Sequence, residues 1–276
     1  DYGKLGGISN QNESRIETNT EKKNPRDFAL WKFDTDKGWQ SPWGMGFPGW
    51  HIECSGMSMH YLGEQFDIHT GGRDLASIHH NNEIAQSECA TGHNYVNYWL
   101  HNEFVNIGSD KMAKSGDNSI TIATLSEKSI NPLALRYLYL QSHYRSQISF
   151  SWDALSGSQT ALHKLQKIIS SFPDSGTISE SYQTLFRDMI SDDLNTAGGL
   201  AIVWELLKNP DVSDADKRAT ILDFDQVLGL KLNEATNTTE QEAKEIPEHI
   251  QKLIEERATA RAQKNWPRAD ELRDQI

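Results

Sequence analysis

The sequence predicts an α/β region followed by an all-α region. The first observation is a strand–helix–strand order between residues 66 and 107, where apolar and aromatic runs flank a helical stretch. This order is typical of a parallel sheet. The second observation is a series of apolar stripes at helical spacing after residue 130, which predicts a helical bundle. The composition agrees, because 37% hydrophobic and 24% charged residues are typical of a folded chain with a core.

Length, charge and cysteine content limit the class of protein. A chain of 276 residues has room for two domains. Its two cysteines cannot form a disulfide framework, which indicates a reduced, cytoplasmic setting. The sequence contains neither a signal peptide pattern nor an apolar run long enough to span a membrane. The net charge of −12 argues against a general nucleic-acid-binding surface but leaves room for a local basic patch.

The first 50 residues have little helical pattern. Residues 1–24 are polar and are expected to form a loop or the edge of an insertion, which the apolar segment 27–32 closes. Residues 33–49 are rich in glycine, proline and tryptophan, a mixture that predicts neither a regular helix nor a central strand. We expect a loop that lies over a pocket. The alternative is a surface loop fixed by its own Trp39 and Trp43.

The pattern with the clearest chemistry joins a cysteine to a histidine and a glutamate 25 and 29 residues further on. His79 and Glu83 share one face of a predicted helix over residues 79–90. With Cys54 alongside, they would offer sulfur, nitrogen and oxygen ligands to zinc. The alternative is an ordinary His–Glu helical pair beside a cysteine that packs as a small apolar residue. Gln86 lies on the same face, whereas Cys89 points elsewhere and is expected to pack.

A helix over residues 55–62 is expected to lead into a buried strand at 66–69, and further strands are expected at 95–100 and 104–107. Gly71 and Gly72 follow the first of these strands, at the edge of a parallel sheet where a ligand can approach the backbone. The alternative is a tight turn that binds nothing.

Two lysines stand in a small polar loop between Gly108 and Gly116. Lys111 and Lys114 are three residues apart, and paired ammonium groups on a glycine-hinged loop suit a polyphosphate. The alternative is an ordinary solvated lysine turn, which is common for so short a pattern.

The rest of the chain is expected to be helical. The first helical element is predicted to run from about residue 133 through His143–Arg145. Apolar stripes then predict helices over residues 162–172, 182–190 and 221–228, the last ending at Gly229. Asn195 or Thr196 is expected to cap a further helix that runs to Leu207. A polar linker at 231–245 precedes two last helices, which Trp266–Pro267 separates.

Together these segments resemble the cysteinyl-tRNA synthetases, a family of class I aminoacyl-tRNA synthetases. The resemblance runs from end to end of the chain and rests on Asn24–Lys32, Ser41–Gly44, Pro48–Ser55, Phe66–His69, His79–Ser87, Asn97–Trp99, Lys111–Ser115, His143–Ser146, Lys264–Trp266 and Ala269–Asp270. It implies the second half of a Rossmann-type catalytic domain, followed by a stem-contact region and a helical bundle.

The resemblance assigns roles to individual residues. It implies that Cys54, His79 and Glu83 bind one zinc ion per subunit. It also implies two overlapping groups. Trp50, His69 and Asp74 would contact the cysteine substrate, and Gly71, Gly72, Asp74, Lys111, Met112, Lys114 and Ser115 would line the nucleotide pocket. Within the last group, Lys111 and Lys114 would be catalytic and stabilise the departing pyrophosphate.

The implied reaction uses ATP with Mg²⁺, L-cysteine and tRNA(Cys), and it needs neither a membrane nor a second subunit. Zinc accepts thiolates readily and hydroxyls poorly, so the metal would select cysteine against serine. The implied domains are the end of a connective insertion at 1–32, the catalytic half at 33–107, the phosphate loop and stem-contact region at 108–160, a tRNA-binding bundle at 161–235 and a helical segment at 236–276.

The sequence departs from the family pattern at several points. Ala113 replaces the middle serine of the lysine loop, and Asn81 stands where the family usually has glutamate. The family's His-Ile-Gly-His motif and one further zinc-binding cysteine would precede this chain, and a C-terminal tail would follow it. We therefore expect a fragment that is inactive by itself.

Two other functions stay open on the sequence alone. The first is the related ligase that joins cysteine to an amino sugar in mycothiol synthesis, which shares the zinc chemistry. The second is a helical binding module that zinc stabilises and that has no catalytic activity.

Overall fold

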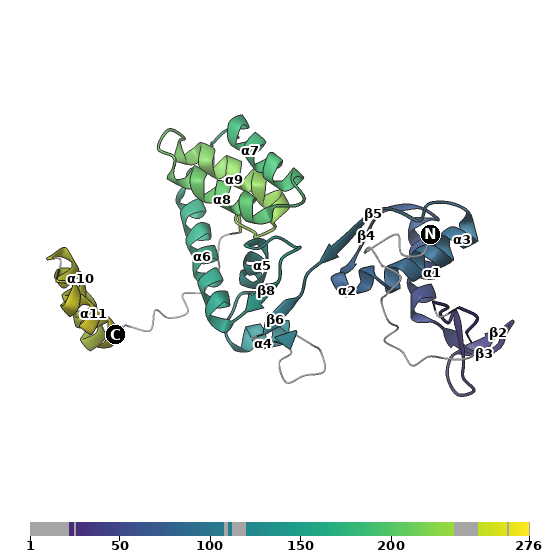
Figure 1. Cartoon of the computed structure of the whole chain (residues 1–276). Helices are drawn as coiled ribbons and strands as arrows, with labels where there is room; N and C mark the ends of the chain where they lie inside the picture. Colours follow the sequence, from purple (N-terminus) through teal and green to yellow (C-terminus); the bar gives the residue numbers. More distant parts are fainter. Residues whose placement is uncertain are drawn as a thin grey trace. The chain divides into compact units, whose positions relative to one another are not determined.

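The computed structural model describes residues 22–24, 26–107, 110–111, 120–234, 248–263 and 265–275 (Figure 1). Contacts along the backbone divide the chain into two units. The first unit comprises residues 1–162 and 179–211, and the second comprises 163–178 and 212–276. Among the described residues, no helix combines the length and the apolar character that a membrane span needs.

The N-terminal part of the first unit begins with a small antiparallel sheet. Its strands are β1 (Trp31–Phe33), β2 (Trp39–Ser41) and β3 (Gly44–Pro48), in the order β1-β3-β2. The prediction that residues 33–49 contain no central strand is therefore wrong. One of the two glycines in β3 has a packing reason, because a Cβ atom on Gly46 would lie 2.1 Å from the carbonyl oxygen of Lys32.

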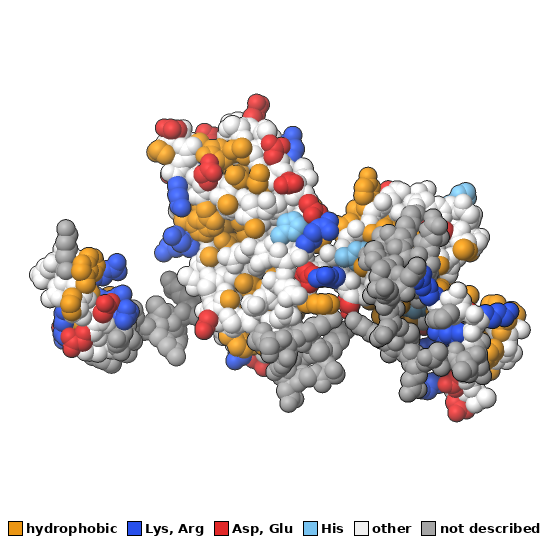
Figure 2. All heavy atoms as spheres, viewed as in Figure 1, with side chains coloured by type: hydrophobic (Ala, Val, Ile, Leu, Met, Phe, Trp, Pro, Cys, Tyr) orange, Lys and Arg blue, Asp and Glu red, His pale blue; other side chains and the backbone are white. Residues whose placement is uncertain are grey.

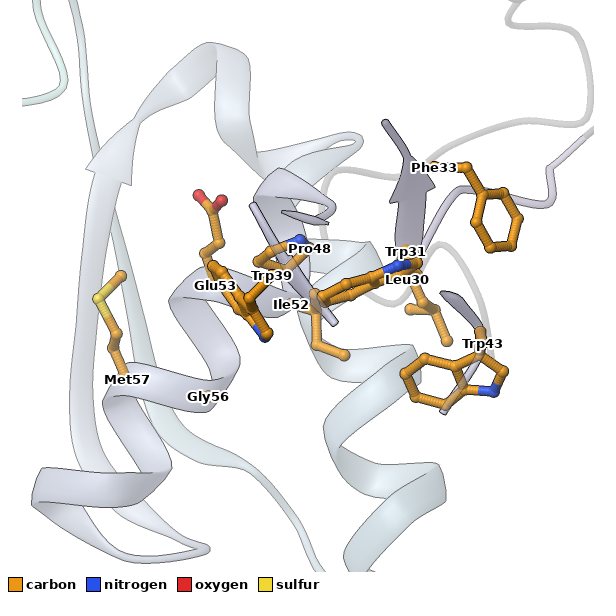
Figure 3. A pocket seen from close by; sticks show the side chains of 10 residues that line it. All are labelled: Leu30, Trp31, Phe33, Trp39, Trp43, Pro48, Ile52, Glu53, Gly56 and Met57. Carbon is orange, nitrogen blue, oxygen red and sulfur yellow. The ribbon is translucent and has the colours of Figure 1, made fainter. Parts of the chain in front are cut away.

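This sheet lines an apolar hollow of about 850 Å³ (Figure 3). Its walls are the side chains of Leu30, Trp31, Phe33, Trp39, Trp43, Pro48, Ile52, Glu53 and Met57, with Gly56 at the helix surface. The expectation of a pocket beside residues 33–49 is confirmed, although a sheet rather than a loop lines it. Trp31 and Trp39 meet edge to face with ring centroids 5.5 Å apart, an arrangement that fixes the sheet by aromatic packing.

The helix α1 (Trp50–Leu62) follows at once and begins five residues earlier than the predicted helix over residues 55–62. It leads to β4 (Phe66–Gly72), the short α2 (Arg73–Ala76), α3 (His79–Thr91) and β5 (Val96–Asn102). The predicted parallel pairing is confirmed, since Phe66 of β4 pairs with Val96 of β5. The expectation that β4 is buried throughout is wrong, because Phe66 is in the core but Ile68 is 58% exposed.

A three-stranded sheet follows β4 and β5 along the chain. Its strands are β6 (Val105–Ile107), β7 (Asp110–Lys111) and β8 (Ile148–Phe150), in the order β7-β6-β8. Helices α4 (Ile122–Glu127) and α5 (Pro132–Leu140) pack on it through a core that includes Leu125, Leu138 and Phe150. The sequence pattern did not indicate β8, whose three residues are too few to show an alternation.

The turn after α5 is held by an ion pair. The expectation that His143–Arg145 continue the helix is wrong, because α5 ends at Leu140. Arg145 Nε donates to Asp193 Oδ2 at 2.6 Å, and the Tyr144 hydroxyl donates to Oδ1 at 2.7 Å. The Arg145 guanidinium and the Tyr144 hydroxyl hold the pKa of Asp193 below its usual range. Asp193 lies in the turn between α7 (Glu180–Ser191) and α8 (Thr196–Lys208), with a left-handed φ of 51°.

The second unit contains the end of α6 (Trp152–Ser171) and α9 (Asp214–Leu228), with Gly229 in a left-handed cap as predicted. Arg218 of α9 donates to the carbonyl oxygen of Ile169 and pairs with Asp174 at 2.7 Å. The helices α10 (Glu248–Ala262) and α11 (Trp266–Gln275) pack on each other through Leu253, Ala260, Ala269 and Leu272.

The start of α9 allows a test of the fold. Ser213 Oγ accepts from the backbone N–H of Asp216 at 3.1 Å and so satisfies one of the helix's unpaired donors. We expect Ser213→Ala to lower the free energy of unfolding by about 1 kcal/mol in urea denaturation. Ser213→Thr, which keeps the acceptor, is the matched control and should lose much less. Equal losses in both variants would show that the hydroxyl does not cap the helix.

The surface carries both signs of charge. Figure 2 shows lysine and arginine side chains interspersed with acidic ones over the face in view, among the residues that the structure describes. This distribution agrees with the net charge of −12. Any nucleic-acid contact on this face therefore depends on local groups rather than on a broad basic field.

Candidate metal and active site

The site is built on the first half of α3. All six residues from His79 to Ile84 are buried, and five of them are polar. Polar side chains are seldom fully buried without partners. A run of buried polar residues therefore indicates a binding site that uses these side chains. Cys54 comes from α1, which packs against α3. Figure 1 shows these two helices beside the strands β4 and β5.

The structure brings the predicted zinc ligands together. One ligand atom from each of Cys54, His79 and Glu83 can be chosen so that all three lie within 4.8 Å of one another. Glu83 Oε1 lies 2.5 Å from His79 Nε2, and Oε2 lies 2.9 Å from His69 Nε2. These contacts are close but lack hydrogen-bond direction, so neither carboxylate oxygen has a hydrogen-bond donor among the described residues. A fully buried carboxylate without donors fits a cation, and this mixed donor set fits zinc.

Burial sets the ionisation of Cys54 and His79 in the metal-free chain. Burial raises the pKa of the Cys54 thiol, and the charges of Glu83 and Glu53 raise it further. Burial lowers the pKa of His79, although the neighbouring Glu83 carboxylate opposes this shift. His79 is therefore neutral at pH 7, as a metal ligand must be. Binding of a metal to Cys54 would displace the thiol proton, so the affinity would rise with pH.

A glutamine fixes the two helices against each other. Gln86 Nε2 donates to the backbone carbonyl oxygen of His51 at 2.6 Å and to Ser55 Oγ at 2.5 Å. Gln86 lies one turn after Glu83 on the predicted face, and Ser55 follows Cys54 directly. These bonds set the register of α1 on α3 and so hold Cys54 opposite its two partners. Cys89, in contrast, is exposed, so the expectation that it packs is wrong.

A group of histidines and aromatic rings extends the site onto the sheet. His69 of β4 pairs in register with Trp99 of β5, and Gly71 pairs with His101. His80 Nδ1 and His101 Nε2 lie 2.7 Å apart. One donor atom from each of His69, His80 and Glu83 also lies within 4.8 Å of the others. The roles of His80 and His101 were missed in the sequence, although residues two apart on a strand share a face and His69, Gly71, Trp99 and His101 follow that spacing.

Gly71 and Gly72 lie at the end of β4, where neighbouring side chains come close to the backbone. A Cβ atom on Gly71 would lie 2.7 Å from His80 Cε1, and one on Gly72 would lie 2.6 Å from Asp74 Oδ1. The buried His80 ring therefore requires glycine at position 71, whereas the exposed Asp74 side chain can turn away from a Cβ atom at position 72. Trp50 is 56% exposed, and its ring centroid lies 4.2 Å from that of His79. The substrate roles of Trp50, His69 and Asp74 stay predictions.

The lysine loop is largely outside the described residues. Met112, Ala113, Lys114 and Ser115 are not described, and Lys111 is described only through its backbone, which pairs with Asn106 in β6 and β7. The roles predicted for these residues therefore stay predictions.

Buried neutral histidines make the stability of the metal-free chain depend on pH. Burial, with neighbouring His69 and His101, lowers the pKa of His80 from 6.5 to about 3. Below pH 6.5 the unfolded chain therefore takes up a proton that folded His80 refuses. This contribution to stability is complete above pH 6.5 and falls as the pH drops from 6.5 towards 3.

We expect the free energy of unfolding of the parent chain to fall as the pH is lowered from 6.5 towards 3. Urea denaturation with chelator at several pH values measures it. The His80→Gln variant should show a shallower fall, by up to one proton on unfolding. The exposed His60→Gln on α1 serves as the control and should keep the parent slope. Identical slopes in the parent and in His80→Gln would contradict a buried neutral His80.

Comparison with known families places the chain in a class. Residues 1–160 match the model of the tRNA synthetases class I (C) catalytic domain. This match covers more than half of the 276 residues. The chain therefore belongs to the class I tRNA synthetases, as the resemblance indicated.

The particular branch follows from the rest of the chain and from its relatives. Residues 243–276 match the cysteinyl-tRNA ligase anticodon binding domain. The chain is 43% identical to cysteine–tRNA ligase 1 of Burkholderia lata, over 92% of this chain and 54% of that protein. It is 41% identical to cysteine–tRNA ligase of Treponema denticola, over 100% of this chain and 63% of that protein. The chain thus spans a little over half to just under two thirds of the length of these curated relatives.

Solved structures give a weaker likeness. A leucyl-tRNA synthetase of Agrobacterium radiobacter in complex with tRNA aligns at a TM-score of 0.45 and 12% identity, over 59% of this chain and 26% of that chain. A methionyl-tRNA synthetase of Mycobacterium tuberculosis bound by methionyl-adenylate aligns at 0.36 and 16%, over 59% of this chain and 40% of that chain.

Proposed function

We propose that the protein carrying this chain is an ATP-dependent cysteine–tRNA ligase of the cytoplasm, active as a monomer. It would form cysteinyl-adenylate from L-cysteine and ATP with Mg²⁺, and then transfer the cysteinyl group to tRNA(Cys). The observation that carries the proposal is the convergence of Cys54 and His79 on the buried carboxylate of Glu83. In a class I tRNA synthetase with cysteine–tRNA ligase relatives, such a site suits selection of a thiol.

The residues would divide the work as follows. Cys54, His79 and Glu83 would hold one zinc ion, which supplies a Lewis acid that favours the thiolate of the substrate. Asp74 would bind the ammonium group of cysteine, and Trp50 and His69 would also contact this substrate. Gly71 and Gly72 would let the nucleotide approach the backbone. The contacts of His69 with Glu83 and of Trp50 with His79 support these roles.

The chemical step needs no protein nucleophile. The carboxylate of cysteine would attack the α-phosphorus of ATP in line, and the bond to pyrophosphate would break. Lys111 and Lys114 would stabilise the charge on the departing pyrophosphate, with Met112 and Ser115 shaping the same loop. A hydroxyl at the 3′ end of tRNA would then attack the adenylate carbonyl, which releases AMP. We also propose the domain limits given in the sequence analysis as the limits of the functional regions of this chain.

The test is charging with radiolabelled cysteine. The protein that carries this chain, supplied with ATP and Mg²⁺, should transfer label to a tRNA(Cys) transcript and not to glucosaminyl-inositol. The Lys114→Ala variant should charge at least about 100-fold more slowly while keeping its zinc, because it loses only transition-state stabilisation. Label on the sugar alone would overturn the proposal in favour of the amino-sugar ligase.

The tRNA reading is favoured over both alternatives by the match at residues 243–276 to an anticodon binding domain, because a sugar ligase has no use for one. A zinc-stabilised module without catalysis would bind zinc but would neither bind ATP nor exchange pyrophosphate. Pyrophosphate exchange that depends on cysteine would exclude it.

A further inference from the structure

His51, which is not one of the predicted metal ligands, contacts the predicted ligand His79. His51 Nδ1 lies 2.8 Å from His79 Nδ1, and this contact has hydrogen-bond geometry. The opposite nitrogen of His79, Nε2, faces Glu83. The two ring nitrogens of His79 are thus divided, with one directed to the proposed metal ligands and the other to His51.

His51 itself is held on several sides. Its backbone carbonyl oxygen accepts from Gln86 Nε2 at 2.6 Å, which ties it to α3. The ring of Phe28 meets the His51 ring edge to face at a centroid distance of 5.4 Å, and the ring of Trp50 stacks on it at 5.8 Å. A side chain with this many partners has little rotational freedom, so its nitrogen marks a defined place for the His79 ring.

We infer that His51 is a positioning residue, which fixes the tautomer and the ring orientation of His79 for metal binding. The inference rests on the zinc site of the proposed function and adds a residue to it. His51 is placed beside a ligand rather than among the donor atoms that converge on Glu83.

The direction of the hydrogen bond gives the inference its chemical content. A neutral imidazole carries one proton, and a metal needs the lone pair of the nitrogen that faces it. If His79 Nδ1–H donates to the Nδ1 lone pair of His51, then His79 Nε2 is free for the metal. If His51 donates instead, the proton of His79 is on Nε2, and this nitrogen cannot bind. Metal-binding histidines commonly donate a hydrogen bond from the ring nitrogen that does not bind the metal, which corresponds to donation from His79 Nδ1–H.

The test compares three variants of the protein that carries this chain in zinc competition with a chromophoric chelator. His51→Ala should weaken zinc affinity about 10–100-fold. His51→Asn should restore most of the affinity, because its Oδ1 can accept from His79 Nδ1–H. His60→Ala, an exposed histidine on the same helix, should bind zinc as the parent does. Cobalt-loaded samples provide a second readout, since a tilted His79 ring changes the d–d absorption of Co²⁺.

Nitrogen-15 NMR of the zinc-loaded parent separates positioning from packing. The proton of His79 should be on Nδ1, with Nε2 shifted by the metal, and His51→Ala should lose the protected Nδ1–H signal. A parent protein that carries this chain and binds no zinc would overturn the proposed metal site and this inference with it. A parent that binds zinc, with equal affinity in His51→Ala, would overturn the inference alone. Loss in His51→Ala without rescue by Asn would assign His51 to packing and also overturn it.

Discussion

A Glu83→Gln chain is expected to lose zinc affinity by more than 100-fold while folding at least as well as the parent without metal. The ligand is lost because a neutral amide oxygen cannot replace the charge of a carboxylate, and even indirect contacts to a metal change affinity by about 10–100-fold. The metal-free protein gains, because the parent buries a carboxylate with 0% exposure and without hydrogen-bond donors among the described residues. Removing a poorly compensated buried charge is often neutral or stabilising.

Two measurements on the same samples check this expectation. Zinc competition gives the affinity, and urea denaturation with chelator gives the stability without metal. Glu64→Gln is the matched control, because Glu64 is an exposed carboxylate outside the proposed ligand set and should leave both quantities close to those of the parent. Retention of zinc by Glu83→Gln would remove Glu83 from the ligand set.

The second large effect is expected in the helical core. Phe224 of α9 is 1% exposed, and its truncation to alanine should lower the free energy of unfolding by about 3–5 kcal/mol. The loss combines the transfer energy of the ring with the cavity that remains. Because domains are stable by only about 5–15 kcal/mol, this one change should remove a large share of the stability of the second unit.

Urea denaturation followed by circular dichroism measures this effect. Val227→Ala, three residues later on the same helix and 50% exposed, is the control and should cost less than about 1 kcal/mol. Phe224→Leu keeps the site apolar and should lose an intermediate amount, which remains measurable if the alanine variant does not fold. A loss in Phe224→Ala no larger than in Val227→Ala would contradict a buried Phe224.

The helices and the pairing of His79 with Glu83 on one face could be predicted, because both depend on local spacing. The helix α3 begins at His79 as expected, and its period of 3.6 residues places His79 and Glu83 on one face. The end of α9 at Gly229 follows from the backbone preference of glycine, which is independent of the rest of the fold. Only the arrival of Cys54 beside this face needed tertiary structure.

The small sheet at residues 31–48 could not be predicted, because contacts with another strand determine where glycine is needed. Gly46 is required by the carbonyl oxygen of Lys32 on a neighbouring strand, and composition alone reads such a glycine as a loop signal. The role of His51 is similar, since its bond to His79 joins positions 28 residues apart. Interactions of this kind have no periodic signature in a single sequence.

The position of the metal ligands along the chain has a consequence for the unfolded state. An ion held between Cys54 and His79 would close a loop of 25 residues that contains all of β4 and α2. A cross-link of this length removes conformational entropy from the denatured chain worth on the order of 3 kcal/mol, as a disulfide does. Zinc would thus act on this segment as a reversible cross-link. A chelator would destabilise the segment selectively, while the helices of the second unit stay folded.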